Sequence, residues 1–134
     1  MAARPQTLPA AVAPVIVGCG VAIALEVFTP AIAAAALGGA VLIQIGTNLA
    51  NDYYDARRGA DTPDREGFTR VTATGLIAPT AVRRAMLACF GLSMLVGVIL
   101  VYVGGWPIVI IGLASIAAGI GYTGGPYPLG YHGL

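Results

Sequence analysis

Two aspartates near the middle of the chain have the spacing of a metal-binding pair. Asp52 and Asp55 close the segment QIGTNLANDYYD, which also carries Gln44, Asn48 and Asn51. In an α-helix, at about 100° per residue, these five side chains share one face about 100° wide, and that face extends about 16 Å along the axis. Solvated loop charges would show no helical phase, so the spacing predicts a polar stripe on one helix.

The stripe offers only hard oxygen and amide donors. Carboxylate and carboxamide oxygens suit Mg²⁺, which keeps several waters and commonly bridges to substrate phosphates. Zinc prefers histidine or cysteine, and the single histidine of the chain is His132. Arginines follow the stripe in the sequence, and one guanidinium group can bind two phosphate oxygens at once. The residues therefore favour a magnesium and diphosphate site. The alternative is that the acids pair with these arginines and order a surface loop.

The composition is that of a membrane protein. Hydrophobic residues make up 57% of the 134 residues and charged residues 10%, and the mean hydropathy is +0.84. A soluble domain carries about 25% charged residues. Four segments have the roughly 20 mostly apolar residues that a membrane-spanning helix needs. We expect spans at about residues 8–28, 30–54, 81–103 and 106–122. The predicted fold is all-α, a polytopic bundle of transmembrane helices in one membrane domain.

The distribution of charge predicts the orientation of this bundle. Apart from Arg4 and Glu26, every charged residue lies between Asp52 and Arg84. By the positive-inside rule, the loop at about 55–80 and the N-terminus face the cytoplasm. The protein is thus expected in the cell membrane (plasma or inner), with the acidic end of the second span on the cytoplasmic side. The net charge of +1 leaves no basic footprint, so we expect a lipid bilayer and no nucleic acid as partner.

Four stretches of the sequence resemble one enzyme family. NLANDYYDARRGAD is similar to the first aspartate-rich motif, of the form N-D-x-x-D, in the UbiA-type superfamily of intramembrane prenyltransferases. The opening ARPQTLPAAVAPV, the loop DREGFTRVTATGLI and the tail YTGGPYPLGYHGL resemble its branch that acts on 1,4-dihydroxy-2-naphthoate in the menaquinone pathway. The resemblance covers essentially the whole chain in order. The first motif alone indicates the superfamily, and the four stretches together indicate the naphthoate branch.

The resemblance implies a reaction and a set of site residues. A polyprenyl group would pass from polyprenyl diphosphate to 1,4-dihydroxy-2-naphthoate in a Mg²⁺-dependent step, with loss of CO₂, giving demethylmenaquinone. By position, Asp52 and Asp55 would be the catalytic residues and metal ligands, with Asn48 as a further ligand. The diphosphate would contact Asn48, Asn51, Asp61, Arg65 and Arg70.

The chain departs from the family pattern in its length and in its acids. The family fold has about nine helices and two aspartate-rich motifs, whereas this chain has about four predicted spans and no acid after Glu66. We therefore expect it to correspond to the N-terminal half of that fold and to be inactive by itself. The resemblance also places Tyr122, Tyr127 and Tyr131 near the aromatic acceptor.

Three alternatives stay open at this stage. The first is the same chemistry on another aromatic acceptor. The second is a small four-span transporter subunit, which would need polar groups facing a pore in several spans. The first, third and fourth spans carry no ionisable pair. The third is a non-catalytic scaffold, which should tolerate Asp52→Asn and Asp55→Asn, whereas an enzyme should lose activity.

Overall fold

The computed structural model describes residues 4–58, 77–124 and 127–131, and the secondary structure in these ranges is helical throughout. Four long helices follow one another: α1 (Leu8–Ala24), α2 (Pro30–Arg58), α3 (Pro79–Gly104) and α4 (Trp106–Thr123). Two short 3₁₀ helices, η1 (Pro5–Thr7) and η2 (Leu129–Tyr131), precede α1 and follow α4. The predicted all-α architecture is confirmed.

Proline and glycine define where the helices begin and end. Each long helix has a proline at its first or second residue, where a missing amide donor costs nothing. The connection between α3 and α4 is Gly105 alone, at φ 71° and ψ −167°, a backbone conformation open essentially to glycine. Helix α1 ends at Ala24, four residues before the expected end of the span, because the chain turns at Glu26 with a φ of 59°.

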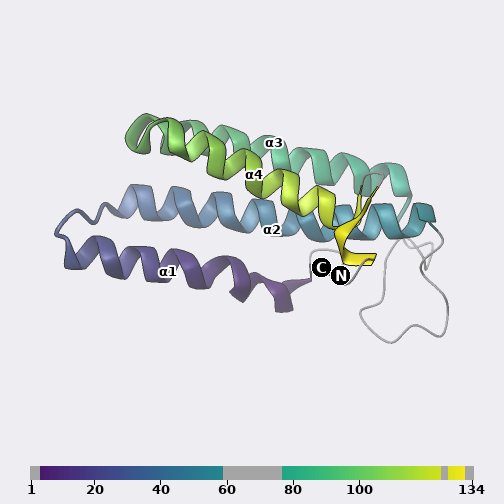
Figure 1. Cartoon of the computed structure of the whole chain (residues 1–134), viewed down its shortest axis with the longest axis horizontal. Helices are drawn as coiled ribbons and strands as arrows, with labels where there is room; N and C mark the ends of the chain where they lie inside the picture. Colours follow the sequence, from purple (N-terminus) through teal and green to yellow (C-terminus); the bar gives the residue numbers. More distant parts are fainter. Residues whose placement is uncertain (1–3, 59–76, 125–126, 132–134) are drawn as a thin grey trace.

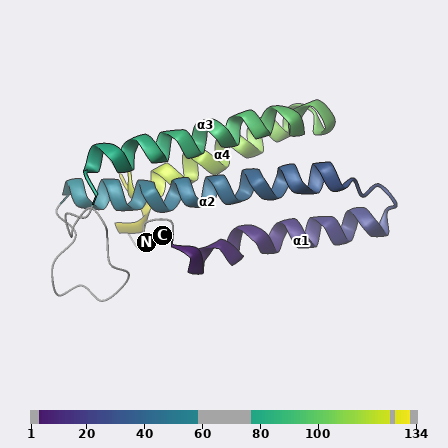
Figure 2. The same ribbon diagram turned by 180° about the vertical axis from the view of Figure 1, so that it is seen from behind.

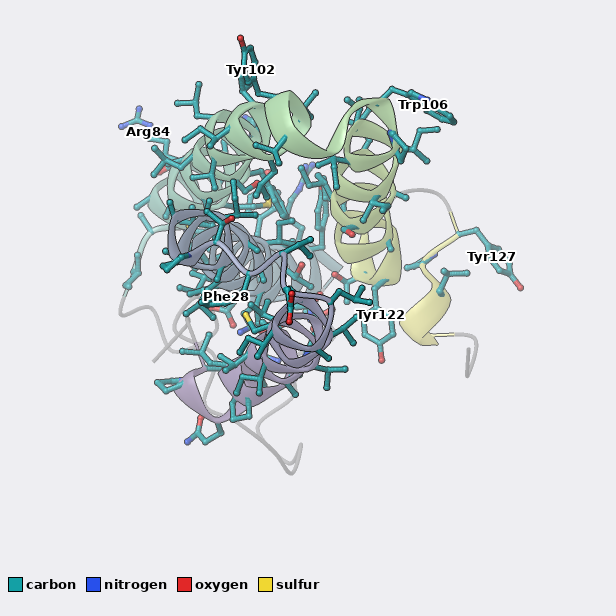
Figure 3. The ribbon with its side chains drawn as sticks, turned by 90° about the vertical axis from the view of Figure 1, so that its left-hand side faces the viewer. Phe28, Arg84, Tyr102, Trp106, Tyr122 and Tyr127 are labelled. Carbon is teal, nitrogen blue, oxygen red and sulfur yellow. The ribbon has the colours of Figure 1, made fainter. Side chains whose placement is uncertain are left out.

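The four helices have the length and composition of membrane spans. The apolar segments run over Pro5–Ala24, Pro30–Arg57, Pro79–Gly104 and Trp106–Thr123, which hold 20, 28, 26 and 18 residues. Large apolar side chains cover the outside, among them Leu95, Tyr102 and Trp106, which are more than 65% exposed. Figure 3 shows Tyr102 and Trp106 directed away from the bundle. Such a surface suits a lipid environment, and the chain forms a multi-pass membrane bundle.

Helix α2 is the centre of the arrangement. It packs against α1, α3 and α4, and α3 packs in addition against α4. Figure 1 shows α2 between α1 on one side and the α3–α4 pair on the other, and Figure 2 shows the same order from behind. The α1–α2 and α3–α4 connections lie at one end of the bundle, opposite the end where α2 finishes and α3 begins. The chain thus runs up and down in sequence order.

The buried apolar core lies between the second half of α2 and the first half of α3. Leu49, Ala50, Val82, Met86 and Phe90 form the buried apolar cluster there. A Cβ atom added at Gly46 of α2 would lie 2.8 Å from the ring of Phe90. A Cβ at Gly119 of α4 would collide with the hydroxyl of Thr47. Glycine at these two positions therefore lets α3 and α4 approach the backbone of α2, as is common in membrane bundles.

Gly46→Ala should destabilise the bundle, because the new methyl group overlaps the ring of Phe90 and a tightly packed core yields little. We expect a loss of about 1–3 kcal/mol, measured as a lower midpoint of thermal unfolding in detergent. Gly38→Ala on the same helix is the matched control, since a Cβ there meets nothing within 4 Å. Adding Phe90→Leu to Gly46→Ala should recover part of the loss. Equal midpoints for Gly46→Ala and Gly38→Ala would refute this packing.

Candidate functional site

The polar stripe of α2 faces the inside of the bundle at its acidic end. Asp52 is 1% exposed, Asp55 is 2% exposed and Asn48 is 3% exposed. Asn51 and Gln44 are half-buried. A charged side chain that pointed into lipid would be costly, and here both carboxylates are enclosed by the neighbouring helices. The structure therefore brings Asn48, Asp52 and Asp55 together on the inner face that the helical spacing predicts.

The segment before α1 is tied to the first of these residues. The amide nitrogen of Asn48 donates a 2.8 Å hydrogen bond to the hydroxyl of Thr7. That hydroxyl donates in turn to the carbonyl oxygen of Arg4, at 2.9 Å. Arg4 is half-buried and has a positive φ of 43°. The two bonds hold residues 4–7 beside α2, one helical turn before Asp52.

Helix α4 is tied to the other amide of the motif. The buried hydroxyl of Thr123 donates a 2.7 Å hydrogen bond to the side-chain oxygen of Asn51. Thr123 is the last residue of α4 and 72 residues away in sequence. The bond therefore sets the register of α4 against α2. It also orients the carboxamide next to Asp52.

The two tyrosines inside the aspartate motif lie off its polar face. Tyr53 and Tyr54 pack against the apolar cluster of α2 and α3, and their rings meet edge to face at 5.2 Å. The guanidinium of Arg57 lies 5.8 Å from the centre of the Tyr53 ring. These contacts stabilise the end of α2.

The donor set fits magnesium better than a transition metal. Asp52 and Asp55 supply hard carboxylate oxygens one turn apart, with the carboxamide of Asn48 a turn below. No group of three or more acidic, histidine or cysteine side chains gathers within the described ranges. Two carboxylates suffice for Mg²⁺, because this ion commonly takes its remaining ligands from water and substrate phosphate.

Part of the predicted site lies outside the described residues. Asp61, Arg65 and Arg70 fall in the segment 59–76, so the predicted phosphate contacts of the loop are not placed. Tyr122 and Tyr127 are 47% and 62% exposed. The ring of Tyr122 lies beside Gly130 of η2, and Figure 3 shows Tyr127 directed away from the bundle.

Sequence reasoning missed the hydroxyl groups that hold the site. Thr7 and Thr123 bond the two amides of the motif, and both lie far from them in the sequence. Ser93 of α3 is 6% exposed and donates to the carbonyl of Phe90. The burial of Ser93 could have been predicted from the sequence, because Met86, Phe90 and Ser93 recur at the spacing of one helical face.

A hollow continues from the polar stripe toward the opposite end of the bundle. It has a volume of about 660 Å³, within the range of small-molecule pockets. All four helices line it, with Gln44, the deepest residue of the stripe, on the wall from α2. The other lining side chains are mainly alanine, glycine, valine, isoleucine and leucine. The stripe connects the carboxylates with the hollow, because its residues Asp52, Asn48 and Gln44 follow one another at intervals of one turn. The distance along the helix axis from Asp52 to Gln44 is about 12 Å.

Comparison with known proteins decides the family. The model of the UbiA prenyltransferase family matches residues 11–134. The chain belongs to the UbiA prenyltransferase family. Its N-D-x-x-D segment and its buried carboxylates thus lie within the part that the family model covers.

Curated relatives of this UbiA family member carry one name. The proteins called 1,4-dihydroxy-2-naphthoate octaprenyltransferase from Escherichia coli, Mycobacterium tuberculosis and Bacillus subtilis are 43%, 40% and 36% identical to it. The matches cover 98%, 98% and 96% of this chain and 44%, 45% and 41% of those proteins. The chain therefore spans less than half the length of these relatives. No solved structure matches it.

Thr123→Val should loosen α4, because valine keeps the shape of threonine but leaves the oxygen of Asn51 without this donor. We expect a loss of about 1–2 kcal/mol in thermal unfolding. Thr123→Ser keeps the hydroxyl and should stay near the parent. Thr80→Val is the control, since Thr80 is exposed at the start of α3. If Thr123→Val and Thr123→Ser unfold at the same temperature, the hydrogen bond does not contribute to stability.

Proposed function

We propose that this chain supplies the first diphosphate-binding half of a magnesium-dependent prenyltransferase in menaquinone biosynthesis. The donor is a polyprenyl diphosphate and the acceptor is 1,4-dihydroxy-2-naphthoate. The observation that carries the proposal is the burial of Asp52 and Asp55 on the inner face of α2. Gln44, two turns further along the same face, lines an apolar hollow. That arrangement suits an amphipathic substrate with an anionic head and a long hydrocarbon tail.

In this proposal the residues of α2 hold the head group. Asp52, Asp55 and Asn48 would hold the magnesium ion, which neutralises the diphosphate when bound and stabilises it as leaving group. The hydrogen bonds from Asn48 to Thr7 and from Thr123 to Asn51 orient the two amides beside the acids. Asp61, Arg65 and Arg70 would add contacts from the loop that follows. Enclosure by the neighbouring helices keeps water away, which strengthens each electrostatic contact.

The proposed reaction joins the tail to the ring. The bond between the allylic carbon and the diphosphate oxygen breaks, and the leaving group keeps the electron pair. A carbon of the electron-rich naphthalene ring forms the new carbon–carbon bond, and the ring carboxyl group leaves as CO₂. The product has the demethylmenaquinone skeleton. The naphthoate acceptor is favoured over other rings by the name that the relatives share.

We further propose that the site opens to the cytoplasm. The ends of α2 and α4 and the start of α3 lie at one end of the bundle, together with Arg57, Arg83 and Arg84. The positive-inside rule assigns this end to the cytoplasmic side of the cell membrane. The diphosphate would then enter from the cytoplasm while its tail stays within the bilayer.

A chimera tests the function directly. This chain replaces the matching N-terminal part of the Escherichia coli relative, with which it shares 43% identity. Transfer of the prenyl group to 1,4-dihydroxy-2-naphthoate is measured in membranes. We expect magnesium-dependent product, and we expect Asp52→Asn and Asp55→Asn each to lower the rate about 100-fold or more, since each removes charge at the leaving group.

The chimera has an internal control. Glu26→Gln also removes one acid, but Glu26 is exposed in the connection between α1 and α2, at the opposite end of the bundle from the carboxylates. We expect this variant to keep the parent rate. Amounts of inserted protein are compared for all variants. Full activity of Asp52→Asn at normal expression would rule out the proposed role of the carboxylates.

A further inference from the structure

Three of the glycines that line the hollow lie at the same depth in the bundle. They are Gly39 of α2, Gly97 of α3 and Gly112 of α4. A Cβ at Gly39 would lie 3.7 Å from Val96, the neighbour of Gly97, so α2 and α3 bring these two glycines to one level.

The register of α4 puts the third glycine at that level. Thr123 bonds Asn51, and Gly119 lies against Thr47, so α4 runs parallel to α2 with a register offset of 72 residues. Gly112 is therefore level with Ala40, next to Gly39. We call Gly39, Gly97 and Gly112 the glycine ring. Gly39 lies about 20 Å along α2 from Asp52.

Two of the three glycines of the ring, Gly97 and Gly112, border open space. A Cβ added at Gly97 or at Gly112 would meet no atom within 4 Å, although both residues are half-buried. A larger side chain at either position can therefore occupy the hollow without first displacing a packed neighbour. These two residues set the room that is left for a ligand.

The chemistry of the lining indicates what occupies the hollow. Its walls are aliphatic, and within the described part of the chain no aromatic residue lines them. Two of the few polar side chains on the walls are Ser93 and Ser115. Each donates a hydrogen bond from its hydroxyl group to a carbonyl oxygen of its own helix. A dihydroxy acid would lack partners for its polar groups there, whereas a hydrocarbon tail needs none.

We propose that the glycine ring determines how long an isoprenoid tail this protein accepts. The inference rests on the proposed function, because it takes the diphosphate head to be held at Asp52 and Asp55. A head at that position sends the tail along the stripe, past Gln44, and through the ring. Short tails end before the ring, and longer tails pass it. Gly97 and Gly112 are thus specificity-determining residues for donor length.

The test measures binding by this chain itself in lipid nanodiscs with Mg²⁺. The probes are geranyl diphosphate, with two isoprenoid units, and geranylgeranyl diphosphate, with four. We expect the parent chain to prefer the longer probe. Gly97→Leu should lower that preference about tenfold, and it should leave the affinity for geranyl diphosphate within about twofold. Gly112→Leu should give the same result from the opposite wall.

The matched control is Gly91→Leu, on the same helix as Gly97. A Cβ at Gly91 also meets nothing within 4 Å, but Gly91 is exposed and does not line the hollow. We expect it to bind both probes like the parent. If Gly97→Leu and Gly112→Leu, eluting as single species, keep the parent's preference, the ring does not set tail length. If the parent chain binds neither probe, that result refutes the proposed diphosphate site, and the proposed effect of the glycine ring on tail length is refuted with it.

Discussion

The structure depends on the enclosure of two carboxylates within a bundle that faces lipid. An acidic side chain in a membrane helix is costly when it has no polar surroundings, by up to about 3 kcal/mol at the helix centre on insertion scales and less toward the ends. Helix α2 carries Asp52 and Asp55 and packs against α1, α3 and α4. The central place of α2 is thus what lets the chain hold acids in a membrane. The tight contact at Gly46 and the bonds to Thr7 and Thr123 all serve to close the neighbours around it.

The bundle divides along its length into a tight half and a hollow half. Near the carboxylates, Phe90 fills the space over Gly46, and Leu49, Ala50 and Met86 complete the cluster. Toward the other end, small residues leave about 660 Å³ open between the same helices. A packed region around the carboxylates and an apolar space beyond them are compatible with the isoprenoid diphosphate proposed as the donor. The same residue type serves both, since glycine gives close approach at Gly46 and open volume at Gly97.

The sequence predicted the elements and the inner face of α2 but not how the elements are joined. The spacing of Asn48, Asp52 and Asp55 was sufficient to predict a shared face, because that face is a local property of one helix. The hydrogen bonds of Thr7 and Thr123 span 41 and 72 residues, and they depend on the register between helices, which helical spacing does not contain. The hollow was missed for the same reason. Glycine in a membrane helix is typical of close packing, and only the structure shows which glycines border open space instead.

The most direct test of the account asks whether the α2 carboxylates hold a divalent cation against a diphosphate. The chain in nanodiscs is loaded with Mn²⁺ in place of Mg²⁺ and with a prenyl thiodiphosphate. Electron–nuclear double resonance then reports the coupling of the bound Mn²⁺ to phosphorus. The account predicts a phosphorus coupling in the parent chain that disappears when Asp52 and Asp55 are both replaced by asparagine. The same coupling in the parent and in the double variant would contradict it.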